Sequence, residues 1–294
     1  MAILTIRHVT RYRYAKPVWF GEHHMMFRPR ESFDQHVLDS SLVITPKPAS
    51  LRYQHDVFGN CVGIARFGAK ANELVFESVN RLKHTPEFAL DQTAGAEEEM
   101  NSYPFAYRPS DLPDVYSSML RAYRPTPDPI PAWSRRFLQN IVRVDAMRVL
   151  TAMTHAIHDE FKYVGRLAGL PQSPAETLEL KSGTCRDFAV LMMEAARSLG
   201  IAARFVSGYI FTPYSSGFTG GGSTHAWMQA YLPGAGWIDF DPTNSIIGNR
   251  NLIRVAVAWS PEQVLPLWGT FDGPAGAFLG MDVAVTVTES GELT

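Results

Sequence analysis

The chain has 294 residues, of which 46% are hydrophobic and 19% are charged, and its formal net charge is −2. This composition is typical of a globular protein, and the near-neutral charge gives no reason to expect nucleic acid or an anionic membrane as a partner. With only two cysteines, Cys61 and Cys185, the chain is no disulfide scaffold, and a reducing compartment is the simpler expectation.

The first residues, M-A-I-L-T-I-R-H-V-T, contain neither a basic nor a strongly apolar stretch of the kind that forms a signal peptide. No apolar run reaches the roughly 20 residues of a membrane-spanning helix. We therefore expect a cytoplasmic protein that does not enter a membrane, and the sequence leaves its oligomeric state open.

Residues 1–90 are predicted to form a β-sandwich domain. Apolar and polar residues alternate from Ile3 to Arg13, and further strand-like runs cover 36–46, 60–67 and 74–82. Proline and glycine separate these runs, as is typical of short strands joined by turns.

A helical and Pro-rich connection is expected over 91–130, with a helix near 111–122 and a stiff P-T-P-D-P-I-P linker at 125–131. A core of helices followed by an antiparallel sheet is expected over 131–260, and a C-terminal β extension over 261–294. The predicted helices before residue 182 cover about 131–142, 145–161 and 174–180. The whole chain is thus assigned to the α+β class.

The stretch 182–200 predicts a helix with Cys185 in its first turn. Apolar residues recur every three or four positions from Phe188 to Leu199, Gly200 follows as a stop, and Thr184 or Ser182 can cap the start. A thiol at a helix N-terminus is a better nucleophile, and the free N–H groups there can bind an oxyanion. On this helix alone, a buried structural cysteine is the more common outcome.

Three strands are expected after this helix, at 203–211, 225–232 and 237–244. Because P-G-A-G joins the last two as a hairpin, His225 at the start of one and Asp241 at the end of the next meet at one edge. Asp239 is the rival carboxylate, but it lies further inside the strand. The pattern predicts a thiol–imidazole–carboxylate triad in which His225 moves the proton and Asp241 orients the ring.

Five further residues are candidates for oxyanion binding or support of the site, each with an ordinary alternative. Tyr163 is either an oxyanion donor or a buried aromatic, and Trp227 either shields the His–Asp pair or packs in the core. Thr184, Arg186 and Asp187 belong to the first turn of the Cys185 helix, where a surface charge pair is the alternative for the last two.

Two histidine pairs and one glycine-rich loop complete the candidates. His23-His24 beside Glu22, and His155 with His158, are weak metal signals, and we interpret both pairs as solvated faces. The loop before His225 contains Gly217 and three consecutive glycines at 220–222, which suits a mobile lid or a plain hairpin loop.

Three motifs resemble those of the transglutaminase-like superfamily, in its order: G-T-C-R-D-F-A, T-H-A-W and G-W-I-D-F-D-P-T-N. The resemblance implies a papain-like triad of Cys185, His225 and Asp241. L-T-I-R-H-V-T-R-Y-R-Y, F-R-P-R and D-V-F-G-N likewise resemble the β domain that precedes the core in bacterial members. One departure is N-L-I-R-V-A-V-A-W-S, where many relatives have a stretch ending in Gly-Arg-Asp-Tyr.

The sequence therefore predicts a thiol hydrolase that cleaves peptide or amide bonds through an acyl-enzyme on Cys185, with a peptide or protein as its substrate. The alternatives are a protein-glutamine acyltransferase and a non-catalytic peptide-binding module on the same fold. No metal or cofactor is expected, because the chain lacks the D-x-D-x-D-G spacing of a calcium loop, although the animal transglutaminases that the core resembles use calcium.

Overall fold

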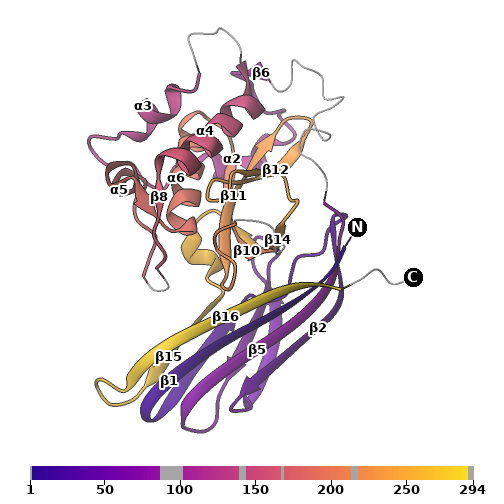
Figure 1. Cartoon of the computed structure of the whole chain (residues 1–294), viewed down its shortest axis with the longest axis vertical. Coiled ribbons are helices and arrows are strands. Elements are labelled where there is room, and N and C mark those ends of the chain that lie inside the picture. The colour runs from indigo at the N-terminus through magenta and orange to yellow at the C-terminus, as the bar shows by residue number, and fades with distance from the viewer. Residues whose placement is uncertain (1, 87–101, 139–143, 167–168, 213–217, 291–294) are drawn as a thin grey trace.

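A computed structural model describes residues 2–86, 102–138, 144–166, 169–212 and 218–290 of the chain. A long curled sheet lies at one end, and a core of helices and a second sheet lies above it (Figure 1). The expectations for residues 91–101, 139–142 and Gly217 fall outside the described residues. No helix within the described ranges is long and apolar enough to cross a membrane.

The sheet at the N-terminal end has seven strands within the described residues, and the two last strands of the chain belong to it. Its order is β2-β5-β1-β4-β3, with β15 and β16 also paired to β1. The strands are β1 (Ala2–Met25), β2 (Gln35–Thr45), β3 (Ser50–His55), β4 (Cys61–Arg66), β5 (Ala71–His84), β15 (Leu267–Asp272) and β16 (Phe278–Ser290).

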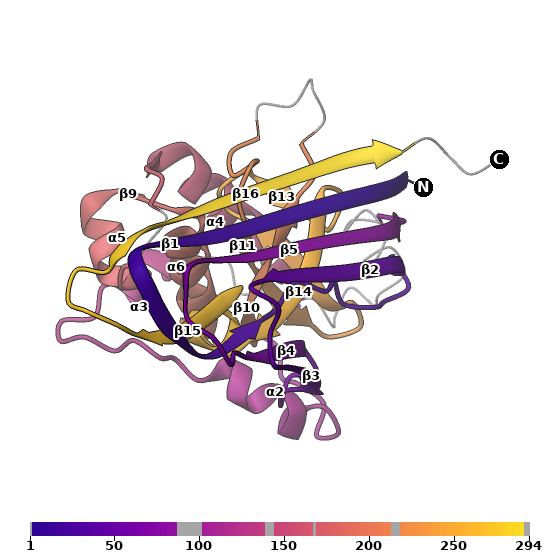
Figure 2. The ribbon, with the colours of Figure 1, turned by 90° about the horizontal axis from the view of Figure 1, so that it is seen from below.

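The predicted sandwich of two separate sheets is instead one curled sheet, because β1 continues through both halves (Figure 2). Its first half pairs with β5 and β16, and its second half pairs with β4 and β15. The register to β5 shifts between Arg13 and Val18, around Pro17, which has no N–H to give to a ladder. Pro17 therefore lies within β1 at the point where its pairing shifts, although prolines were expected to separate strands.

The core contains a five-stranded antiparallel sheet in the order β13-β12-β11-β10-β14, with its helices packed against it. The strands are β10 (Ala203–Ile210), β11 (His225–Leu232), β12 (Gly236–Asp241), β13 (Ile246–Ile247) and β14 (Leu252–Ala258). The helices are α2 (Leu112–Met119), α3 (Ile130–Arg135), α4 (Ala146–Glu160), α5 (Pro174–Leu180), α6 (Cys185–Ser198) and the 3₁₀ helix η1 (Pro261–Val264).

Two short pairs of strands tie the helices together: β6 (Ser102–Tyr103) with β7 (Val144–Asp145), and β8 (Lys162–Tyr163) with β9 (Ser182–Gly183). The second pair is parallel and fixes Tyr163 opposite Gly183, two residues before Cys185. The predicted helix over 182–200 thus forms as α6, directly behind β9.

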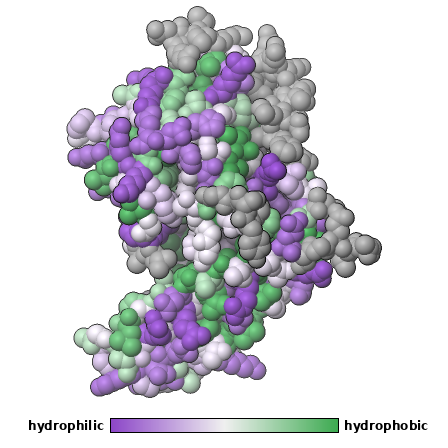
Figure 3. Space-filling model, in the orientation of Figure 1, coloured by the Kyte–Doolittle hydropathy of each residue, from purple (hydrophilic) through white to green (hydrophobic). Residues whose placement is uncertain are grey.

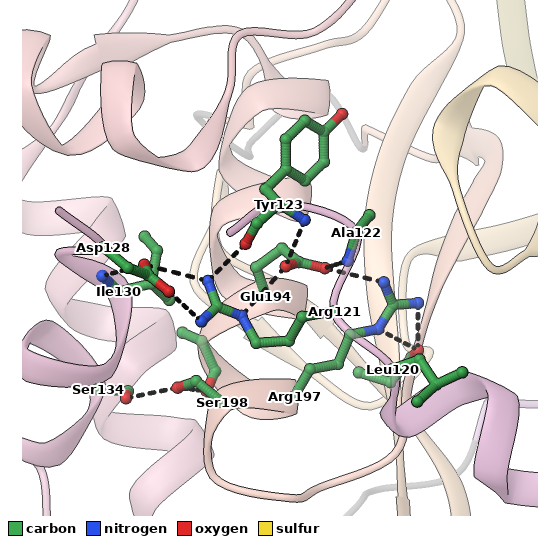
Figure 4. Close-up of polar contacts among 12 residues, drawn as sticks. Leu120, Arg121, Ala122, Tyr123, Asp128, Ile130, Ser134, Glu194, Arg197 and Ser198 are labelled. Atoms are coloured by element: carbon green, nitrogen blue, oxygen red, sulfur yellow. Dashed lines mark hydrogen bonds and ion pairs between the residues drawn. The ribbon is translucent and has the colours of Figure 1, made fainter. Parts of the chain in front are cut away.

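Helix α6 is buried on all sides, although the sequence suggested a single apolar stripe. Every residue from Asp187 to Arg197 is buried, including the charged side chain of Glu194. Backbone N–H groups of Ala122 and Tyr123 and the guanidinium groups of Arg121 and Arg197 all donate to that carboxylate (Figure 4). This network anchors the C-terminal half of the helix, while Cys185 lies at the other end.

The curled sheet docks on the core through two side-chain amides, which bond the backbone of β14 as a neighbouring strand would. The Asn60 amide donates to Val257 O at 2.8 Å and accepts from Val257 N at 2.9 Å. Gln35 makes the same pair of bonds with the backbone of Arg254, at 2.8 and 3.0 Å. These bonds satisfy the free edge of β14, and in the space-filling view apolar residues gather around the same junction (Figure 3).

Candidate active site

Cys185 begins α6 because the residues before it form a tight, well-bonded cap. Thr184 is the N-cap, and the buried carboxylate of Asp187 accepts from the Thr184 N–H at 2.7 Å and from its hydroxyl at 2.9 Å. A Cβ on Gly183 would lie 2.8 Å from the Cβ of Asp187, so only glycine fits there. The thiol is therefore held at the positive end of the helix.

Asp187 also fixes the loop that leads from α4 to α5. It accepts from the Gln172 N–H at 2.7 Å and from the Arg166 guanidinium at 3.0 Å. Arg186 donates to the backbone carbonyls of Arg166 and Gly169 in the same loop. The alternative of a simple surface charge pair is thus wrong for Asp187, which is fully buried.

His225 and Asp241 meet at one edge of the core sheet, as the hairpin predicts. The His225 Nε2 lies 2.8 Å from the Asp241 Oδ2, and both side chains are fully buried. A carboxylate can only accept, so Nε2 carries the proton and Nδ1 is the nitrogen that remains for the thiol. Among the described residues, Nδ1 has no hydrogen-bond partner at ordinary distance.

The turn after β12 holds Asp241 through contacts that sequence reasoning missed. The Thr243 N–H donates to Asp241 Oδ1 at 2.9 Å, and the Asn244 amide donates to Oδ2 at 2.8 Å. Asn244 also bonds both backbone groups of Thr219, at 2.6 and 3.1 Å. The D-P-T-N letters signal such a turn, since Asp and Asn commonly bond nearby backbone, but they do not reveal the link to the loop before His225.

Two histidines of α4 form hydrogen bonds with this turn. His158 Nδ1 lies 2.9 Å from Thr243 O, and His155 Nδ1 lies 2.5 Å from Ser245 Oγ.

The other histidine pair, His23-His24, does not form the predicted solvated face. His23 is buried among Phe20, Phe67 and Phe76. His24 bonds Glu22 and stacks on Trp268. Within the described ranges, no cluster of three or more His, Cys, Asp or Glu side chains could hold a metal ion.

The charges of the site favour a protonated imidazole. Burial opposes the charge, but the Asp241 carboxylate and the Cys185 side chain outweigh it and raise the pKa of His225. Burial likewise opposes the Asp241 carboxylate, yet His225, Asn244 and the Thr243 N–H together lower its pKa. The site therefore stabilises an imidazolium between two acidic groups.

Cys185 and His225 line a single cavity of about 450 Å³, together with Tyr163, Arg186 and Thr184. A Cβ at Gly220 would lie 2.7 Å from His225 Nδ1, so a side chain at that position would obstruct the imidazole. Tyr163 is half-buried, and burial together with the nearby Cys185 raises its pKa to about 12. Its hydroxyl remains a hydrogen-bond donor at neutral pH.

Trp227 lies under His225 and outside the cavity. It is fully buried, its ring stacks on the imidazole at 5.9 Å between centroids, and its Nε1 donates to Asp239 Oδ1 at 2.6 Å. Asp239 also accepts from Arg254 at 3.2 Å. The rival carboxylate therefore supports the tryptophan, and only Asp241 bonds the imidazole. The catalytic roles of these residues stay predictions.

Most of the stretch that departs from the resembling motifs forms β14, the edge strand next to β10 in the core sheet. Trp259 Nε1 donates to Leu120 O at 3.0 Å, and Arg197 donates to Trp259 O at 2.7 Å. The residues that follow, Pro261 and Val264, line the cavity. The departing stretch therefore contacts Leu120 and the C-terminal end of α6, which is the end of that helix opposite Cys185.

The fold and the site define an α+β protein with a cysteine at a helix N-terminus and a His–Asp pair on neighbouring strands. Family models confirm the resemblance: residues 4–82 match the bacterial transglutaminase-like N-terminal region, and residues 138–242 match the transglutaminase-like superfamily core. The chain belongs to the transglutaminase-like superfamily.

Similar proteins match this chain over most of their length. An uncharacterized protein of Mycobacterium leprae is 27% identical over 290 residues, 97% of this chain and 98% of that protein. One of Mycobacterium tuberculosis is 26% identical over 273 residues, 90% of this chain and 86% of that protein. The crystal structure of a putative cysteine protease from Cytophaga hutchinsonii is 18% identical, with a TM-score of 0.72 over 100% of this chain and 92% of that one.

Proposed function

We propose that the protein is a thiol hydrolase that cleaves peptide or amide bonds through an acyl-enzyme on Cys185. The observation that carries the proposal is the buried His225–Asp241 pair, because His225 and Cys185 line the same cavity. A cysteine at a helix N-terminus beside an oriented imidazole is the arrangement of an activated thiol nucleophile. The similar structure from Cytophaga hutchinsonii is named a putative cysteine protease, which is consistent with this proposal.

The steps follow from these positions. His225 Nδ1 accepts the thiol proton, and the sulfur attacks the carbonyl carbon of the substrate. The N–H groups of the first turn of α6 and the Tyr163 hydroxyl stabilise the oxyanion. The C–N bond then breaks as the imidazolium gives its proton to the leaving amine. Water attacks the thioester, releases the acid and restores the thiol.

Water is favoured over a lysine as the acyl acceptor on grounds of charge. None of the described residues that line the cavity is acidic, and two of them, Arg166 and Arg186, are basic. A lysine ammonium approaching this cavity meets charges of its own sign.

A protein-glutamine acyltransferase is the second candidate, because the cavity is more enclosed than the loop sequence suggests. Strands β1 and β16 of the curled sheet form part of its lining, so the glycine-rich loop is not its only wall, and Trp227 is not a wall. Enclosure that excludes water is what transfer to an amine requires.

The experiment supplies glutamine-containing and other short peptides together with excess labelled cadaverine. Release of free acid and amine, with acylated Cys185 trapped in a His225→Ala variant, is the expected result. Faster incorporation of cadaverine than release of acid identifies a transferase. If no peptide acylates Cys185, the site is a binding module.

The thiol itself provides an earlier test with iodoacetamide. We expect Cys185 to be alkylated faster than Cys61 across pH 5–9, because burial raises the pKa of the Cys61 thiol and Cys61 lies in a strand, whereas Cys185 begins a helix. Mass spectrometry of the two tryptic peptides gives both rates in one sample. Equal rates in the folded protein would contradict an activated nucleophile.

A further inference from the structure

We infer that the curled sheet forms a specificity wall of the candidate active site, and that the site takes acyl groups with a bulky apolar side chain. The inference rests on the proposed hydrolase function and names the substrate class of the same cavity. It starts from residues of β1 and β16, which lie about 100 or more positions from Cys185 in the chain yet line its cavity.

Strand alternation assigns one face of β16 to the cavity. Met281 and Val283 line it and are partly buried, whereas Asp282 and Ala284 between them are exposed on the opposite face. The N–H of Val285, on the cavity side, donates to Gly222 O at 2.9 Å. This bond ties the wall to the loop that precedes His225, so the wall and the imidazole keep a fixed relation.

The segment between β14 and β15 extends the apolar wall. Its cavity-lining residues, together with the first residue of β15, are all aliphatic or proline, and the last three are only partly buried, which leaves apolar surface beside an open space of about 450 Å³: Pro261, Val264, Leu265, Pro266 and Leu267. A substrate side chain that removes such surface from water binds favourably. Cavities of this size hold small organic groups or a few peptide residues.

The polar part of this wall is neutral. His8 Nδ1 lies 2.9 Å from the Tyr209 hydroxyl, and its Nε2 lies 2.9 Å from Thr10 Oγ1, so both nitrogens have partners. Burial lowers the pKa of His8 to about 4, and the ring is uncharged at neutral pH. The two guanidinium groups of the lining belong to α6 and the loop before α5, where Arg166 pairs with Asp187. A lysine side chain would meet no carboxylate in the lining and would lose hydration.

The test uses dipeptidyl chloromethyl ketones that differ only in the side chain next to the ketone: Leu, Phe, Glu or Lys. The rate of Cys185 labelling is measured by mass spectrometry, with iodoacetamide as a probe that has no side chain. We expect the Leu and Phe probes to label at least about tenfold faster than the Lys probe, as is common for hydrophobic pockets. Equal rates, or a preference for Lys, would overturn the inference.

Matched variants assign the preference to the sheet. Val283→Asp is expected to reduce the Leu-to-Lys rate ratio at least about tenfold, whereas Ala284→Asp, on the exposed face of the same strand, should leave it within about twofold. Met281→Ala, which adds no charge, should slow the Leu and Phe probes and spare iodoacetamide. If Val283→Asp and Met281→Ala both keep the wild-type ratio of Leu to Lys labelling rates, the wall does not select the substrate.

The two proposals fail in distinguishable ways. If iodoacetamide and all four probes label Cys185 but the probes show no side-chain preference, the wall inference is wrong and the hydrolase proposal stands. If Cys185 reacts with iodoacetamide but no peptide probe or amide substrate acylates it, the hydrolase proposal fails and the specificity wall fails with it.

Discussion

Asp239 and Asp241 lie two residues apart on β12, and their partners separate their roles. Asp241 bonds the His225 imidazole, and Asp239 bonds Trp227 and Arg254. The alternation of a strand puts both on one face, and only the depth of each in the strand decides which one reaches the histidine. The sequence predicted this choice because Asp239 lies further inside the strand than Asp241.

We expect Asp241→Asn to lower kcat by a factor on the order of 10⁴, because an amide can stabilise neither the correct tautomer nor the imidazolium. Asp239→Asn should reduce kcat much less, while it lowers thermal stability by weakening the Trp227 and Arg254 contacts. Steady-state kinetics and thermal unfolding of both variants give the comparison. The reverse order of kcat values would assign the orienting carboxylate to Asp239.

Asn244 is expected to position Asp241 and the loop before His225. Asn244→Ala removes a hydrogen bond to the Asp241 carboxylate and two bonds to Thr219. Hydrogen bonds to charged groups contribute about 1.5–3 kcal/mol, so kcat/KM should fall by roughly 10- to 100-fold. The fall should appear mainly in kcat, since Asn244 is absent from the described lining of the cavity.

The control for Asn244 is Ser245→Ala, which removes the contact of the same turn with His155 and no contact with Asp241. Its kcat is expected to stay near that of the wild type. A loss of kcat in Ser245→Ala as large as in Asn244→Ala would show that the turn acts only through its overall stability.

At the scale of elements, local patterns predicted α6 and the three strands β10, β11 and β12. The spacing of apolar residues and the turn residues that identify these elements lie within or next to each segment. They did not predict β15, which pairs with β1 across more than 240 positions of the chain. Pairing at that distance leaves no local signal. The burial of α6 on all sides was missed for the same reason, since Glu194 finds its partners in the distant residues Arg121 to Tyr123.

The Glu194 network allows a test of stability that is separate from catalysis. All four groups that bond this carboxylate are donors, so Glu194→Gln leaves at least one donor facing an amide NH₂ (Figure 4). Breaking a buried ion pair in this way costs about 3–5 kcal/mol. Chemical denaturation should show this loss, and alkylation of Cys185 in the folded variant should keep its wild-type pH profile. A shifted profile would mean that the network also acts on the thiol.

At the scale of the whole molecule, the chain closes on itself, because β16 returns to pair with β1 from Ile3 to Tyr14. The N-terminal and C-terminal segments thus form one sheet, and that sheet supplies a wall of the candidate active site. The domain boundaries expected from the sequence stay predictions. Composition could not indicate that β15 and β16 pair with β1, because nothing in the sequence of a strand identifies a distant partner strand.

A buried ion triad joins the two parts of the molecule. Arg254 of β14 bonds both oxygens of Asp34, at 2.5 and 2.6 Å, and one oxygen of Asp239 at 3.2 Å. Burial opposes the Asp34 carboxylate, but the charge and hydrogen bonds of Arg254, with those of Ser32 and Asn249, lower its pKa below the ordinary 3.8. Because Asp239 also bonds Trp227, which stacks on His225, these three ions connect the docked sheet to the candidate active site.

The lowered pKa of Asp34 sets the sign of its pH dependence. A group whose pKa is lower in the folded state stabilises the fold fully above the unfolded pKa, and this contribution is lost as the pH falls through the folded pKa. We therefore expect the free energy of unfolding to decrease below about pH 4, with Asp34 and Asp241 both contributing, since the pKa of each is lowered. Denaturant titrations from pH 3 to pH 7 measure the decrease.

Asp34→Asn tests the contribution of the docking contact separately from that of the His225–Asp241 pair. The variant should be less stable at pH 7, because Arg254 loses a buried charged partner, and its stability should fall less steeply below pH 4 than that of the wild type. Asp282→Asn is the control, since Asp282 pairs with Arg13 on an exposed face where an ion pair contributes little, and it should follow the wild type at every pH. Parallel curves for Asp34→Asn and the wild type would show that the docking of the sheet does not depend on the charge of Asp34.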